Sequence, residues 1–235
     1  MSLIIDNSSF STLSSSGTSK SFSYTVGSSG SNTGLFASAS LRAQSGTVPP
    51  NTITATYNGV SMTKIGEHTY NGTTADILVA FFYLASPATG ANTLAFSWTV
   101  SSIGAFAPIS FYGVSKSSPW RSGSYTTLAG TNSGTLSINV PSNAGDYVLD
   151  VVSCEGYGGG APANLEEDAS QTQIMDGEVA VTNRMAYGAS YKSGASPTLS
   201  MVWTKDGGLY AIMAGISVQP ANRSTGVVVS PMMRF

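Results

Sequence analysis

Charged side chains are scarce in this chain of 235 residues. Asp, Glu, Lys and Arg together make up 9% of the sequence, whereas about a quarter of an ordinary globular chain is charged. The ten Lys and Arg residues are scattered singly between Lys20 and Arg234, and the net charge is −2. Nucleic-acid binding needs clustered cations facing the phosphates, so we expect no nucleic-acid partner.

Long hydrophobic runs are also missing. The longest apolar run, from Ile77 to Ala85, is far shorter than the roughly 20 residues that a membrane helix requires. The segment Met1–Asp6 has neither the basic start nor the sustained apolar stretch of a secretion signal. We therefore expect a protein that is made in a cytoplasm and has no membrane partner.

The chain has one histidine, His68, and one cysteine, Cys154. A Ser-His-Asp triad would have to use His68, a Cys-His pair would need both residues together, and two such ligands cannot close a zinc site. No Gly-x-Ser-x-Gly, Gly-x-Gly-x-x-Gly or Walker sequence is present. We expect no catalytic residues, no metal ligands and no cofactor. His68, beside the turn signal Asn71-Gly72, is expected in an exposed loop, and Cys154 in a buried strand.

Acidic residues are concentrated in one region only, at Glu166, Glu167, Asp168, Asp176 and Glu178. The first interpretation is a solvated acidic loop that keeps a nearly neutral protein soluble. The alternative is a calcium site built from Asp176-Gly177-Glu178 and nearby carbonyl oxygens, because hard cations prefer oxygen ligands.

Strand signals fill most of the sequence, and Ser and Thr make up about a quarter of it. The run Asp76–Leu84 is apolar on both faces, which predicts a central strand covered on both sides. Asn58-Gly59 joins two alternating runs, which predicts a tight hairpin. The expected strands cover residues 21–26, 35–41, 52–57, 60–65, 76–84, 92–99, 107–114, 135–140, 146–154, 171–175, 184–191, 198–203 and 209–218. This pattern predicts an all-β fold: a single antiparallel, jelly-roll-like β-sandwich with short arms at both ends.

The expected organisation is an N-terminal arm over residues 1–19, a sandwich domain over 20–220 and a C-terminal tail over 221–235. Residues 8–19 are rich in Ser and Thr and suggest a flexible or extended arm. The stretch Gly158–Pro162 is the best candidate boundary, but we interpret it as a long loop within one domain. The most helix-like stretch, Pro162–Gln173, lacks an apolar face of helical period.

Two segments are candidates for contact with a partner. Trp98 and Trp203 lie inside expected strands and should be core residues, whereas Trp120 and Arg121 lie in a loop. A loop Trp beside an Arg either anchors the loop or contacts a protein or glycan partner. The tail combines a β-branched run with residues able to fill a pocket, and it can fold back or dock on another subunit. Its candidate residues are Val227, Val228, Val229, Met232, Met233 and Phe235.

The segments Ile53–Gly66, Phe82–Leu94, Ile109–Val114 and Tyr210–Val218 together resemble a widespread β-sandwich family of phage structural proteins and bacterial surface proteins. The resemblance spans roughly residues 20–220 and implies a jelly-roll-like or lectin-like sandwich. It carries no catalytic signature onto this sequence.

These observations favour a non-enzymatic virion structural protein of a tailed phage, most simply a head decoration (cement) protein and next a tail or fibre component. Its expected partners are copies of itself and a major capsid or other virion protein, and its expected location is the virion. A surface poor in charge suits packing many copies side by side, because few ions are desolvated at each contact. The alternative is a carbohydrate-binding adhesion module that binds a surface glycan, with or without calcium.

Overall fold

The computed structural model describes residues 2–43, 52–71, 76–155, 164–179, 184–207 and 210–221. Every regular element in these ranges is a β-strand and every strand pairing is antiparallel, so the expected all-β sandwich fold is confirmed. In chain order the strands are β1 (Ile4–Ser8), β2 (Ser11–Val26), β3 (Gly34–Ala43), β4 (Thr54–Tyr57), β5 (Val60–Ser61), β6 (Thr63–Asn71), β7 (Asp76–Ala85), β8 (Gly90–Tyr112), β9 (Thr126–Thr131), β10 (Thr135–Pro141), β11 (Tyr147–Glu155), β12 (Asn164–Glu167), β13 (Thr172–Val179), β14 (Met185–Ser193), β15 (Thr198–Asp206) and β16 (Ala211–Val218).

Strand β8 is 23 residues long and takes part in two layers. Its first part, residues 90–97, pairs with the second part of β2 and, over Leu94–Ser97, with β4. Its second part, residues 102–112, pairs with β3 on one side and with β1 and the first part of β2 on the other. The two strands expected at 92–99 and 107–114 are therefore parts of one long, bent strand.

The second half of the chain repeats this topology with separate strands. β3 lies between β7 and β8 as β11 lies between β14 and β16, and β6 and β13 form the outer edges beside β7 and β14. The first part of β8 lies between β4 and β2 as β15 lies between β12 and β10. β9 pairs with β16 as the first part of β2 pairs with the second part of β8. Each half thus forms a jelly roll, and β5 is an addition to the first one.

A short sequence match accompanies the repeated topology. Thr93-Leu94 and Trp98-Thr99 on β8 have the same spacing as Thr198-Leu199 and Trp203-Thr204 on β15. Both tryptophans are buried, as expected for core residues. Leu94 and Leu199 also lie opposite equivalent strands, since one pairs with β2 and the other with β10.

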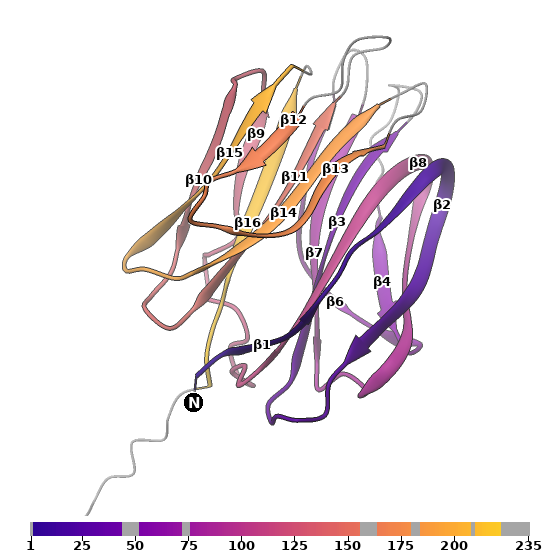
Figure 1. Ribbon diagram of the computed structural model, residues 1–235. Coiled ribbons are helices and arrows are strands. Elements are labelled where there is room, and N and C mark those ends of the chain that lie inside the picture. Colours follow the sequence, from indigo (N-terminus) through magenta and orange to yellow (C-terminus); the bar gives the residue numbers. More distant parts are fainter. Residues whose placement is uncertain are drawn as a thin grey trace, which may run out of the picture.

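The sheets of the two jelly rolls are stacked as layers, and three buried apolar clusters fill the space between these layers. The first lies inside the first jelly roll and includes Leu78, Phe82 and Phe96, and the third lies inside the second one and includes Val152 and Trp203. The second, which we name the central cluster, joins the two jelly rolls. It takes residues from β3, β7 and the second part of β8 on one side and from β11, β13, β14 and β16 on the other. Figure 1 shows the layers in sequence, from β10 and β15 through β11 and β14 to β3 and β7, with β4 on the far side.

The contact between the two jelly rolls explains why four strands are buried on both faces. β3, β11 and β16 are buried or nearly so along their length, as is β7 from Asp76 to Tyr83. One face of each strand packs within its own jelly roll and the other face packs against the opposite jelly roll. The prediction that the run 76–84 is covered on both sides is confirmed. The β-sandwich therefore consists of two jelly rolls that are packed face to face.

Several local predictions can be compared with the structure. Asn58 and Gly59 have φ values of 49° and 75°, and Tyr57 pairs with Val60, so the two-residue hairpin is confirmed. The N-terminal segment differs from the expected arm, because β1 and β2 pair with β8 over most of their length. Its Ser-rich composition is compatible with an edge strand whose outward side chains meet water.

Other differences concern the second half of the chain. Residues 164–167 of the most helix-like stretch form β12, which pairs with β15. The Gly158–Pro162 stretch lies outside the described residues, between two strands of the second jelly roll. The last strand ends at Val218, as expected from Pro220. Within the described ranges, no helix is long and apolar enough to cross a membrane.

Candidate functional site

The chain passes from the first jelly roll to the second through residues 113–125, which we name the crossover loop. This loop lies against the end of β16. Val114 forms an isolated bridge with Pro220, Trp120 forms one with Val218, and the Arg121 backbone N–H donates to the Ser217 carbonyl at 2.8 Å. The loop that connects the two units therefore lies beside the segment through which the described chain ends.

Trp120 is half-buried and anchors the crossover loop. Its indole packs against the central cluster and contacts the Tyr83 ring in an edge-on arrangement, with 5.7 Å between the ring centroids. Tyr83 belongs to β7 of the first jelly roll, while the backbone of Trp120 pairs with β16 of the second. The side chain thus packs at the boundary between the two units.

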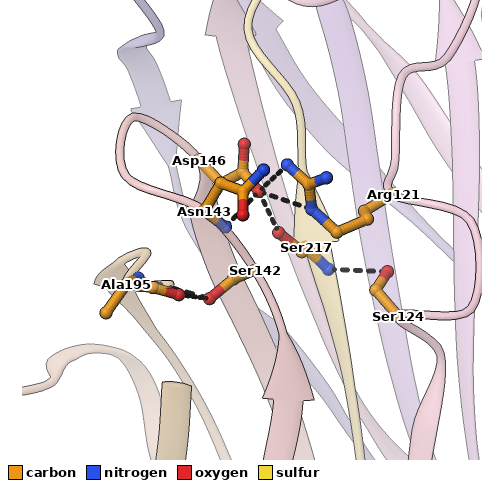
Figure 2. A network of polar contacts seen from close by, with 7 residues as sticks. All are labelled: Arg121, Ser124, Ser142, Asn143, Asp146, Ala195 and Ser217. Atoms are coloured by element: carbon orange, nitrogen blue, oxygen red, sulfur yellow. Dashed lines mark hydrogen bonds and ion pairs between the residues drawn. The ribbon is translucent and has the colours of Figure 1, made fainter. Parts of the chain in front are cut away.

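Arg121 forms an ion pair with Asp146 in the turn between β10 and β11. Its Nε and Nη2 donate to the same Asp146 oxygen, Oδ2, at 3.0 and 2.7 Å. The Asp146 side chain is 2% exposed, and Oδ2 also accepts from the Ser217 hydroxyl and the Asn143 backbone N–H, each at 2.9 Å. Figure 2 shows Arg121 extending from the crossover loop to this carboxylate, which Ser217 reaches from β16. A buried carboxylate with this many donors holds the loop in place.

Hydroxyl groups extend the network on both sides of the ion pair. Ser124, in the crossover loop, accepts a hydrogen bond from the Ser217 N–H at 3.1 Å. Ser142 donates to the Ala195 carbonyl at 2.5 Å and accepts from the Ala195 N–H at 3.2 Å. The network ties the crossover loop, the β10–β11 turn and the β14–β15 turn into one end of the second jelly roll.

An open cleft of about 490 Å³ lies on the outer side of the crossover loop, and we name it the polar cleft. It is lined by Ser117, Ser118, Pro119, Trp120, Arg121, Ser122 and Gln219. Its lining offers hydroxyl groups, one amide and the accessible part of an indole. Such a surface can hydrogen-bond and stack on a polar ligand, but it presents no pair of carboxyl groups for acid-base chemistry.

A second cleft of about 650 Å³ lies near Ala221, where the described chain ends, and we name it the apolar cleft. It is lined by Ser2, Ile4, Ser29, Gly30, Ser31, Tyr112 and Gly113. Ile4 is 59% exposed there, which is unusual for a large aliphatic side chain. Ala221, the last described residue, donates its N–H to the Gly113 carbonyl at 2.7 Å.

Asp6 fixes the wall of the apolar cleft. Its carboxylate accepts hydrogen bonds from the Tyr112 hydroxyl and the Gly27 N–H, both at 2.7 Å, and from the Ser110 hydroxyl at 2.8 Å. Burial acts to raise the pKa of Asp6, but these hydrogen bonds outweigh it and hold the pKa below its usual value. The Tyr112 ring is therefore held in a fixed position beside Gly30.

The two candidate nucleophilic or basic residues lie on different strands. Cys154 is completely buried on β11 within the third cluster, where burial raises the pKa of its thiol to about 11, so the buried thiol is confirmed. His68 lies on β6 rather than in a loop, because the strand continues to Asn71. It is half-buried, and burial lowers the pKa of its imidazole.

The acidic residues at the calcium candidate lie on adjacent strands. Glu166 and Glu167 are on β12, and Asp176 and Glu178 are on β13. Burial raises the pKa of Asp176, and the nearby Glu167 and Glu166 raise it further. Among the residues that the structure describes, no group of three or more His, Cys, Asp or Glu is arranged to hold a metal ion.

Among the buried polar groups that sequence reasoning missed is the carboxylate of Asp150. Its Oδ1 accepts from the backbone N–H and hydroxyl of Ser190 at 2.7 and 2.9 Å, and its Oδ2 accepts from Trp203 Nε1 at 2.8 Å. Gln171 completes the network through the Ser190 hydroxyl, at 2.8 Å. The available signal was a lone carboxylate within the apolar run Tyr147–Cys154.

In comparisons with known proteins, no family model, curated protein or solved structure matches the chain. Of the expected partner-contact residues, Trp120 and Arg121 lie together in the polar cleft. Val227, Val228, Val229, Met232, Met233 and Phe235 lie outside the described residues.

Proposed function

We propose that this chain is a non-enzymatic structural protein of a phage virion, in the first instance a head decoration (cement) protein and in the second a tail or fibre component. The observation that supports the proposal is the pair of jelly rolls stacked through a shared apolar cluster. Jelly rolls are typical of viral capsid and lectin domains, so this support is an analogy at the level of the fold.

The surface composition supports the same function. Only 22 of the 235 residues are charged, counting the 10 Lys and Arg with the 12 Asp and Glu. The outward-facing residues of β2 and β10 are mostly serine, threonine and asparagine. Contacts between neighbouring copies, or with a major capsid protein, would therefore bury few ions, whose desolvation opposes association.

The test is the presence and stoichiometry of the chain on purified particles of the phage that encodes it. We expect a fixed, high copy number by quantitative mass spectrometry, and density for two stacked jelly rolls at repeated positions in particle images. Recombinant chain should also saturate particles that lack it. Particles on which the chain is absent, and to which it does not bind, would refute a virion role.

The polar cleft favours a second candidate, a carbohydrate-binding adhesion module. It combines an indole with hydroxyl and amide groups, which are the groups that bind sugars by stacking and hydrogen bonding. A binding module should give a glycan-array signal and a higher melting temperature with the sugar, with or without calcium. Ser122→Trp, which would fill the cleft, should abolish that signal, whereas Ser101→Trp on the exposed surface of β8 should leave it unchanged.

A further inference from the structure

The apolar cleft has the properties of a receiving site for an extended apolar segment. Ile4 in its lining is 59% exposed, and the Tyr112 ring beside it is fixed by the hydrogen bond to Asp6. Ile4 belongs to β1, which pairs on one side with β8; among the described strands, none pairs with its other side. An incoming strand can therefore hydrogen-bond to β1 and place its side chains in the cleft.

The described chain ends at the rim of this same cleft. Ala221 donates its N–H to the carbonyl of Gly113, and Gly113 lines the cleft. Figure 1 shows the end of the described chain close to the N-terminal end, where β1 begins. Fourteen residues follow Ala221 in the sequence, and they combine a polar part, residues 222–226, with the apolar candidates named above.

The five residues between Ala221 and Val227 bear on whether the tail binds the molecule's own cleft or the cleft of a neighbouring copy. Five extended residues span at most about 17 Å. Because Ala221 already contacts Gly113 at the rim, the molecule's own cleft lies within reach without a five-residue spacer. The same five residues are long enough to carry Val227 across a contact between two adjacent copies.

We propose that the tail beginning at Val227 binds the apolar cleft of a second copy of this chain, with Val227–Val229 added as a strand to the free edge of β1. Met232, Met233 and Phe235 then supply side chains for the cleft around Ile4. The choice of a neighbouring copy rests on the proposed function, which brings many copies side by side. The contact is head-to-tail, so it links copies in series or closes a ring.

The test uses full-length variants in which either the cleft or the tail is blocked by a charged residue. Ile4→Glu blocks the cleft and Val228→Glu blocks the tail. Val60→Glu is the matched control, because Val60 is 54% exposed on β5, away from the cleft. Wild type should self-associate as its concentration rises in analytical ultracentrifugation. Each blocking variant should weaken the apparent Kd about tenfold or more, since a charge enters an apolar contact, and the control should match wild type.

Mixing the two blocked variants decides between a neighbour's cleft and the molecule's own. Ile4→Glu keeps an intact tail and Val228→Glu keeps an intact cleft, so an equimolar mixture should form a heterodimer and nothing larger. A mixture that stays monomeric, or a wild type that does not self-associate, would overturn the proposal. If Ile4→Glu lowers the melting temperature, Ser29→Trp takes its place, because Ser29 is an exposed residue of the cleft lining.

Particle binding separates this proposal from the proposed function. If wild type occupies purified particles but does not self-associate, the tail contact is wrong and the virion role stands. If wild type self-associates through the cleft but is absent from particles and does not bind them, the virion role is wrong and the tail contact stands.

Discussion

Lowering the pH from about 8 to about 5 should stabilise the second jelly roll, because Asp150 is buried in its core. Burial raises the pKa of this carboxyl group from 3.8 to about 7, although hydrogen bonds from Trp203 and Ser190 act in the opposite direction. The nearby charge of Glu167 adds a smaller increase. The folded protein therefore binds a proton at Asp150 at a pH where the unfolded chain has released it.

The direction of the effect follows from this difference. Between pH 3.8 and about 7 the folded state holds more protons at Asp150 than the unfolded state, so the free energy of unfolding falls as the pH rises. The loss is complete above about pH 7. One pKa unit corresponds to about 1.4 kcal/mol, so a difference of about three units amounts to about 4 kcal/mol for a fully buried group.

The assay is urea unfolding of wild type and Asp150→Asn across this pH range. Asn cannot ionise, so the variant should lose the part of the pH dependence that Asp150 supplies. It should also be less stable at low pH by about 1–3 kcal/mol, because its amide N–H₂ faces the donors that the carboxyl oxygens accepted. Asp176 and His68 titrate in both proteins, so the difference between the two curves isolates Asp150.

Two results would refute this reasoning. The first is a pair of parallel stability curves for wild type and Asp150→Asn between pH 5 and pH 8, which would mean that Asp150 does not titrate near pH 7. The second is a difference of the opposite sign, with wild type gaining stability relative to the variant as the pH rises. That result would mean that the hydrogen bonds from Trp203 and Ser190 outweigh burial.

Three further predictions concern single residues. Gly59→Ala should lower the free energy of unfolding in urea by about 1–2 kcal/mol, because φ is +75° at Gly59. The control Gly134→Ala should lower it less, because its new Cβ makes only an ordinary contact; equal losses would contradict the turn assignment. Cys154→Ala and His68→Ala should leave particle binding and self-association intact, with at most a small loss of melting temperature; a stable variant that loses either property would reopen an enzymatic interpretation. Arg121→Ala should destabilise by about 3–5 kcal/mol because it leaves a buried carboxylate unpaired; a change below about 1 kcal/mol would show that water replaces the guanidinium.

The fold class could be predicted because local patterns determine it. Alternation and turn residues locate most strands, and the Asn58-Gly59 hairpin follows from the φ values that only a few residues adopt easily. The apolar run on β7 indicated a strand covered on both sides, since a one-sided strand would alternate. These features depend on neighbours in sequence, which a single chain displays.

The pairing of distant strands could not be predicted in the same way. The bend in β8 and the position of β2 depend on contacts between segments far apart in sequence, and β2 has the Ser-rich composition of a flexible arm. The candidate site was found only in part. Trp120 and Arg121 were recognised as loop residues, but the partner of Arg121 is Asp146, 25 residues further along the chain, and neither spacing nor composition identifies it.

Both candidate clefts lie near the end of the molecule where the chain connects the two jelly rolls and where the described chain ends. Two jelly rolls of the same topology on one chain need one connection and one exit, and here both lie at the same end, at the crossover loop and at Ala221. The strands that form the central cluster pack against each other, so their faces are not available to a partner. Both clefts therefore lie near this end, the polar cleft at Gln219 and the apolar cleft at Gly113, which contacts Ala221. The end of the stack that holds the crossover loop and Ala221 thus offers two clefts through which the protein can contact other molecules.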